Sequence, residues 1–517
     1  MNKVIVIGSG ISGMTCACAL ANKKYDVTVF EKHYVYGGYC QSFTRKGFKF
    51  GAAVHRVGGI YGKENINCIL RAVGVEQLPD WYSFKEKVQV GDISISMCNS
   101  NIAEQLENMY PKEKDHIQKF WEVVQKLDKL LNIIDKGANS GIEKFSVQDL
   151  EMLKKYRKIS VDEFLDLFFD HKEIKGILIA VSDAMPGGSV FAFIRMIAFA
   201  NCGEDTYQPV GGACKIIEVL AKRIEDLGGK ICLQTPVEKI IIQDGKAVGI
   251  ISKGKKYYAD YVVSNCDMAF TLYNLIGVKY LNPRLIQKVE TKFTESPSCF
   301  SVWLGLDKDV KSLGYEPINI SFYPDKNSVL EDKTKLIAPD SMQSDNDFLL
   351  ISLSANNDPH SCPEGKGQMM LGMLVNWGFE KLVELRKNGN MEEYKKRKVR
   401  VAEKLIKKAE RFYPDLRKHV EFMEIASPST FERYTGNAKG AFGGYKCTPE
   451  LVENYSIIDG KQLVGNLYTT GHWGGVGDGV IFTTDVAMRI ADKIIRRDGR
   501  TDLYDFNKNH EDEVKTG

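Results

Sequence analysis

Three glycines near the N-terminus have the spacing of a phosphate-binding turn. They are Gly8, Gly10 and Gly13 in the stretch MNKVIVIGSGISG, and Glu31 follows at the end of the next hydrophobic run. Such glycines let the backbone approach a pyrophosphate, while the N-terminus of the following helix faces its negative charge. A carboxylate at this distance accepts hydrogen bonds from ribose hydroxyls and repels a ribose 2′-phosphate. These residues predict a site for a dinucleotide that lacks a 2′-phosphate.

The elements that must position these residues are present around the turn. Residues 4–7 predict a buried parallel strand, residues 11–23 a helix, and residues 27–30 a second strand that ends at Glu31. Small side chains in the helix allow it to approach a sheet closely. The strand, turn, helix and strand together favour a dinucleotide site over a glycine-rich turn without a ligand.

A second glycine pair, Gly37 and Gly38, follows in the stretch EKHYVYGGYCQSF. This stretch resembles an extension found in flavoproteins of the amine oxidase and carotenoid desaturase type, where the pair passes beneath the diphosphate of the cofactor. Dehydrogenases that bind NAD do not need it. The resemblance favours FAD, with Lys32 and Tyr39 among its contacts.

A glycine-rich loop near the other end of the chain also precedes a predicted helix. The stretch NLYTTGHWGGVGDGVIFTT predicts a strand over 466–470 and an amphipathic helix from Val480 onward. In flavoproteins such a helix points at N1 and the C2 carbonyl of the flavin and stabilises the reduced ring. A third segment, 205–270, contains a predicted helix over 215–227, a strand that ends near 235–237, a hairpin at 244–245 and a strand over 259–265. We expect this segment to bring the backbone of Val237 to the adenine ring.

The FAD contacts expected from these motifs are Gly8, Gly10, Ile11, Ser12, Gly13, Glu31, Lys32, Gly37, Gly38, Tyr39, Val237, Gly471, Gly479, Val480 and Ile481.

Over nearly its whole length the chain resembles the FAD-dependent phytoene desaturase, carotenoid isomerase and retinol saturase family. Besides the two glycine motifs, the resemblance rests on GFKFGAAVHRVGG, QPVGGACKIIEVLAKRIEDLGGKI, ADYVVSNCD and DPHSCPEGKGQMML. It implies an FAD-dependent oxidoreductase that acts on carbon–carbon bonds of an apolar, polyene or isoprenoid-like, substrate. Saturation, desaturation and isomerisation all stay open.

The chain departs from the family pattern at two places. Residues 51–53 are Gly-Ala-Ala where an aspartate is common, which weakens any transfer of desaturase chemistry. His472 and Trp473 stand where an acidic residue often follows the glycine of the last motif, so the flavin contact there would be made by the backbone.

The expected fold is α/β, with a doubly wound, Rossmann-type FAD-binding domain built from residues 1–75, 205–270 and 425–500. Residues 76–204 and 271–424 are expected to form an interleaved α+β substrate domain, in which helices cover an antiparallel sheet. Residues 501–517 form a C-terminal tail.

His55 and His472 are the candidate acid–base residues, because an imidazole of near-neutral pKa beside a flavin can exchange protons during double-bond chemistry. The alternative for His55 is a structural hydrogen bond. The alternative for His472 is a structural role, in which its neighbour Trp473 forms a wall beside the flavin ring. Glu204 and Tyr207 are weaker candidates for the mouth of the site. The eight histidines are dispersed and lack ligand spacing, so we expect no metal site.

Composition limits the partners and the compartment. A net charge of +3 gives no reason to expect nucleic acid. Twelve scattered cysteines and a first strand that begins at Lys3, which leaves no room for a signal peptide, favour the cytoplasm. The apolar window 176–200 is interrupted by charged residues, proline and glycine, so we expect a buried helix pair. A membrane-facing surface, with peripheral membrane contact, is the alternative.

Two other functions stay open on this scaffold. One is a flavin amine oxidase, and the other is a non-catalytic protein that binds prenyl groups or lipids, like the GDP dissociation inhibitors. A second strand, GxGxxG turn and helix for a nicotinamide is not evident, so the electron donor or acceptor is unknown and would be a transient molecule or a partner protein. The glycine-rich stretch 436–444 is expected to pass close to the flavin or the substrate.

Overall fold

The computed structural model describes residues 1–58, 65–98, 101–135, 145–202, 206–330, 348–377, 380–454, 464–475, 477 and 479–500. The expected tail 501–517 and the candidate Glu204 lie outside these residues.

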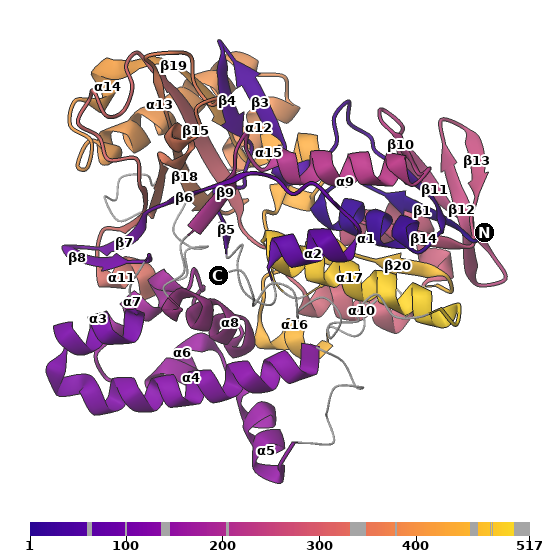
Figure 1. The fold of residues 1–517 in the computed structure, drawn as a ribbon, viewed down its shortest axis with the longest axis horizontal. Coiled ribbons are helices and arrows are strands. Elements are labelled where there is room, and N and C mark those ends of the chain that lie inside the picture. The colour runs from indigo at the N-terminus through magenta and orange to yellow at the C-terminus, as the bar shows by residue number, and fades with distance from the viewer. Residues whose placement is uncertain are drawn as a thin grey trace.

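A parallel sheet of five strands forms the centre of the cofactor-binding part of the chain (Figure 1). Its order is β10 (Lys230–Cys232), β2 (Asp26–Phe30), β1 (Lys3–Ile7), β14 (Tyr261–Ser264) and β20 (Leu467–Thr469), and all neighbours run parallel. The three sequence segments expected to build one α/β domain therefore contribute to one sheet. The expected strand end near Val237 is wrong, because β10 ends at Cys232 and Val237 begins β11 (Val237–Gln243).

Successive strand residues point to opposite faces of this sheet, and each face has its own apolar cover. On one face Val4 and Val6 pack in a cluster with three helices: α1 (Ile11–Asn22), α9 (Cys214–Asp226) and α17 (Val480–Arg497). On the other face Ile5 and Ile7 pack in a cluster with an antiparallel sheet of β11, β12 (Lys246–Ser252) and β13 (Lys255–Tyr258) and with α10 (Pro283–Lys292). The second cover is thus partly a sheet and not helices alone.

A second, seven-stranded sheet forms the other half of the molecule. Its order is β19 (Val420–Ala426), β15 (Ser298–Leu306), β18 (Gly367–Val375), β17 (Leu349–Ser352), β16 (Asn319–Tyr323), β7 (Glu86–Val90) and β8 (Ile93–Ser96). All neighbours are antiparallel except β16 and β7, which run parallel. Helix α13 (Met391–Ala409) packs on this sheet through a stripe of buried side chains that includes Val401, Leu405 and Ile406.

The hairpin of β3 (Ser42–Arg45) and β4 (Phe48–Gly51) lies against this second sheet. Phe48 and Phe50 pack in one cluster with Trp303 of β15, and the Trp303 indole N–H donates to the Gly51 carbonyl oxygen at 2.9 Å. Although residues 1–75 were assigned to the cofactor domain, the apolar side of this hairpin is covered by the other half of the molecule.

Six helices form a bundle below the second sheet (Figure 1). They are α3 (Ile102–Met109), α4 (Lys114–Asp135), α5 (Val147–Tyr156), α6 (Val161–Asp166), α7 (Lys172–Val181) and α8 (Val190–Asn201). The apolar window 176–200 supplies most of α7 and α8, whose buried residues join one core, so the expected helix pair is confirmed. Of the described helices, none is long and apolar enough to cross a membrane.

The remaining elements connect these parts. They are β5 (Val57–Gly58), α2 (Ile66–Ala72), β6 (Trp81–Phe84), β9 (Thr206–Pro209), α11 (Lys326–Leu330), α12 (Glu380–Lys387), α14 (Leu416–His419), α15 (Pro428–Thr435) and α16 (Pro449–Asn454). Strands β5, β9 and β6 pair in a small antiparallel sheet next to His55.

Candidate active site

Glu31 is buried and directly follows β2, and both oxygens of its carboxylate accept hydrogen bonds. Oε2 accepts from the Ser9 backbone N–H at 2.9 Å and from the Ser9 hydroxyl at 2.5 Å, and Oε1 accepts from the His33 backbone N–H at 2.8 Å. A carboxylate can accept about four hydrogen bonds, so capacity is left for a ribose hydroxyl. These donors fix the carboxylate at the first turn, where the sequence placed it.

The first turn presents free backbone donors at the start of α1. Gly10 is the N-cap of α1 and makes no side-chain cap, so the first N–H groups of the helix are left for a ligand. A Cβ atom on Gly13 would lie 2.2 Å from the Gly8 carbonyl oxygen, so only glycine allows this approach. Gly37 donates its N–H to the Ser9 carbonyl oxygen at 3.0 Å and forms an isolated parallel β-bridge with Gly10. These contacts place the second glycine pair against this turn.

The N-terminus of α17 meets that of α1. The Ser12 hydroxyl donates to the Thr483 carbonyl oxygen at 2.7 Å and lies 2.7 Å from the Thr470 hydroxyl. The Ser12 side chain therefore joins two helices, and only its backbone remains for a cofactor. Gly479 is the N-cap of α17 with a φ of 88°, makes no side-chain cap, and would place a Cβ atom in open space.

Two uncapped helix N-termini side by side fit a dinucleotide that carries two electronegative groups. In FAD these would be the diphosphate at α1 and the flavin carbonyl edge at α17. Val237 lies near Glu31, because the Thr235 N–H donates to the Glu31 carbonyl oxygen at 2.7 Å. Lys32 is exposed, Tyr39 and Ile481 are half-buried, and Val480 is buried. Glu31, the glycine turns and the two helix starts are the residues that would hold the cofactor.

Asn437 organises the surroundings of His472, and sequence reasoning did not single it out. Its Oδ1 accepts from the Trp473 indole at 2.9 Å, and its Nδ2 donates to the Ala441 carbonyl oxygen at 3.2 Å. The same Nδ2 lies 3.5 Å from Nε2 of His472 and 3.3 Å from the Tyr39 hydroxyl. The sequence feature that could have identified Asn437 is its position in the glycine-rich stretch 436–444, and this stretch lies at the candidate site.

The two candidate histidines do not have the near-neutral pKa that the sequence argument assumed. Both residues are half-buried. Desolvation by the surrounding protein lowers the pKa of His55 to about 4 and that of His472 to about 4. Both imidazoles are therefore neutral at pH 7, and their pKa lies below the near-neutral value that the sequence argument assumed.

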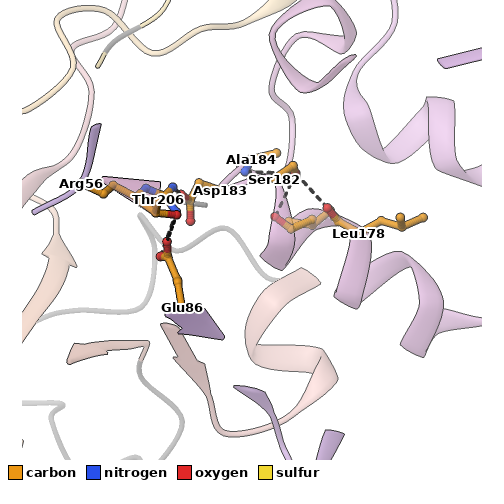
Figure 2. A network of polar contacts seen from close by, with 8 residues as sticks. Arg56, Glu86, Leu178, Ser182, Asp183, Ala184 and Thr206 are labelled. Carbon is orange, nitrogen blue, oxygen red and sulfur yellow. Dashed lines mark hydrogen bonds and ion pairs between the residues drawn. The ribbon is translucent and has the colours of Figure 1, made fainter. Parts of the chain in front are cut away.

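Arg56, the residue after His55, belongs to a network that joins distant parts of the chain (Figure 2). The neighbouring Arg56 forms an ion pair with Glu86 of β7 at 2.9 Å and a second ion pair with Asp183, in the turn between α7 and α8. Thr206 of β9 donates its hydroxyl to Glu86 at 3.3 Å. Tyr207, a weaker candidate, is half-buried and pairs with Val57 in the small sheet.

A cavity of about 740 Å³ lies between the helical bundle, the segment 443–447 and α17. Its volume falls in the range of small-molecule sites. The lining is mostly apolar and includes Leu131, Leu153, Phe191, Phe193, Met196, Tyr445 and Phe482. His55 and His472 are not among the lining residues, but the Tyr445 ring lies 4.9 Å from the Trp473 ring, centroid to centroid. The cavity therefore borders the loop that carries His472.

Comparisons with known proteins agree with this geometry. Residues 6–67 match the model of an NAD(P)-binding Rossmann-like domain. An all-trans-retinol 13,14-reductase of Danio rerio is 23% identical over 498 residues, which cover 90% of this chain and 82% of that protein. A chloroplastic prolycopene isomerase of Daucus carota is 26% identical over 493 residues, covering 89% of this chain and 76% of that protein.

Among solved structures, a putrescine oxidase variant superimposes with a TM-score of 0.65 at 12% sequence identity, covering 96% of this chain and 99% of that one. This likeness shows the fold alone. The Rossmann-like match and the geometry of the first turn define a protein with a Rossmann-type, dinucleotide-binding domain. The family resemblance predicted from the motifs, to the flavoproteins that include retinol reductases and prolycopene isomerases, is confirmed.

Proposed function

We propose that this protein is an FAD-dependent oxidoreductase that acts on carbon–carbon double bonds of an apolar polyene. The observation that carries the proposal is the apolar cavity, whose wall includes Gly477 and Phe482 at the start of α17, the helix whose N-terminus would face the flavin. The named activities of the relatives support the same class of chemistry.

FAD supplies hydride or electron transfer at its N5 atom when it is bound. The residues of the protein would bind and orient the substrate. Phe191, Phe193 and Phe482 exclude water from the cavity and hold the apolar part of the substrate. His472 is held by Asn437, and both candidate histidines are neutral, so each would offer an N–H or a lone pair rather than an imidazolium proton. A proton needed for saturation would then be drawn from solvent.

The partners and the compartment belong to the same proposal. The substrate is an apolar small molecule, the electron partner is a transient molecule or another protein, and nucleic acid is not a partner. We propose a cytoplasmic location, with peripheral membrane contact as the alternative that an apolar substrate would favour.

The test is anaerobic and uses the purified holoprotein, with flavin-free protein as the control. Reduced protein is mixed with conjugated polyenes, and oxidised protein is offered polyenes and, separately, amines. Flavin reoxidation with one double bond saturated identifies a reductase, and isomerised polyene over a flavin that stays reduced identifies an isomerase. Bleaching of the oxidised flavin by a polyene identifies a desaturase.

Two outcomes contradict the proposal. If amines but no polyene bleach the oxidised flavin, the protein is an amine oxidase, a function that the putrescine oxidase fold likeness keeps in view. If the protein is colourless and cannot be reconstituted with FAD, it is a binding protein on this scaffold.

A further inference from the structure

One wall of the cavity is basic. Lys154, Arg157 and Lys158, from the end of α5 and the turn that follows it, line this wall. Of the acidic residues that line the cavity, Asp183 is paired with Arg56, and Asp485 is paired with Arg489 at 3.0 Å. Glu453 is the remaining acid of the lining, so the three cations outnumber it.

The three cations of this basic wall are exposed at the edge of the cavity, and none of them pairs with a carboxylate of the described residues. Arg157 donates to the carbonyl oxygens of Val452 at 3.0 Å and Glu453 at 3.2 Å, which fixes the guanidinium but leaves its charge in place. Lys154 and Lys158 make no ion pair with any residue that the structure describes. Lys154 lies in the last turn of α5 and Lys158 in the turn that follows it, so both like charges line the same wall of the cavity.

Most of the remaining lining is apolar. Leu131, Leu153, Phe191, Phe193 and Met196 come from the same bundle as the basic wall, and Phe482 comes from α17. A hydrocarbon ligand would satisfy these side chains and leave the three cations without a counter-ion. An amphiphile with an apolar chain and an anionic end matches both parts of the cavity.

We propose that the cavity binds an acyl or isoprenoid chain that ends in a carboxylate or a phosphate, with the anionic end at Lys154, Arg157 and Lys158. The apolar chain then lies along the phenylalanines toward Gly477 and Phe482. This inference rests on the proposed function and narrows its substrate class from an apolar polyene to an anionic one.

The test measures binding to the holoprotein, independently of turnover. The probe is cis-parinaric acid, a conjugated polyene carboxylate whose fluorescence rises on burial, compared with its uncharged methyl ester. We expect the acid to bind about tenfold more tightly than the ester, and the Lys154→Gln/Lys158→Gln double variant to lose that preference. Lys155→Gln is the matched control, because Lys155 is exposed like Lys154 and Lys158 but lies over the Tyr156 ring and does not line the cavity.

Competition identifies the anionic end. Displacement of the probe by dodecyl phosphate but not by inorganic phosphate shows that head and chain bind together, whereas equal displacement by both shows a free anion site and overturns the proposal. Equal binding of acid and ester, or an acid preference that survives the double variant, also overturns it. Failure of every polyene to react with the flavin would contradict the proposed function and leave this binding result standing.

Discussion

Among single residues, Glu31 bears most directly on cofactor choice. It is a buried carboxylate oriented by two donors of Ser9 in the first turn and by the His33 N–H, and a ribose hydroxyl would be its next partner. The substitution Glu31→Gln keeps the shape of the side chain but replaces the charged carboxylate acceptor with a neutral amide. Because a hydrogen bond to a charged group is worth about 1.5–3 kcal/mol, we expect FAD to bind about 10- to 100-fold more weakly.

The measurement is the quenching of flavin fluorescence as apoprotein is titrated into FAD. Glu238→Gln is the control, since Glu238 is exposed at the start of β11 and undergoes the same chemical change. Unchanged FAD affinity in Glu31→Gln would show that the carboxylate does not contact the ribose.

Among secondary-structure elements, the meeting of α1 and α17 decides where the two ends of a dinucleotide can sit. Ser12 makes this contact, and the Thr470 hydroxyl that faces it is buried. Ser12→Ala leaves a buried hydroxyl without this partner, so we expect the free energy of unfolding to fall by about 1–3 kcal/mol.

Urea unfolding of the apoprotein, followed by far-UV circular dichroism, measures this loss. Ser94→Ala, at an exposed position of β8, should change the free energy of unfolding by less than about 0.5 kcal/mol. A Ser12→Ala effect no larger than that of Ser94→Ala would mean that the hydroxyl does not hold the two helices together.

Across the whole molecule, Arg56 joins the small sheet beside His55 to β7 and to the turn that lines the cavity (Figure 2). The Glu86 side chain is 3% exposed, so Arg56→Leu leaves a buried carboxylate without its cation. We expect a loss of about 2–4 kcal/mol in the free energy of unfolding. Glu86→Gln in the same background should recover part of it, because the uncompensated charge is removed.

A double-mutant cycle of these two changes, read by urea unfolding, checks this expectation. Lys222→Gln supplies the surface comparison: its partner Asp226 lies 2.7 Å away on an exposed helix face, and such pairs contribute under about 1 kcal/mol. Additive effects of Arg56→Leu and Glu86→Gln would contradict a coupled pair.

Local patterns were sufficient for the elements that the chain builds from neighbouring residues. The run 3–30 predicted β1, α1 and β2 to within a residue or two. Glycine spacing and the Glu31 carboxylate also indicated the cofactor class. Periodicity and turn chemistry act over a few residues, so a single stretch carries this information.

Tertiary structure decided whatever depends on residues far apart in the chain. Asn437 reaches Tyr39 and Trp473, the hairpin 42–51 packs on the second sheet, and the cavity takes its walls from α5, α8, the segment 443–447 and α17. The lowered pKa of His55 and His472 likewise follows from burial by other segments. Desolvation and close packing depend on everything that surrounds a group, and a linear pattern does not record those surroundings.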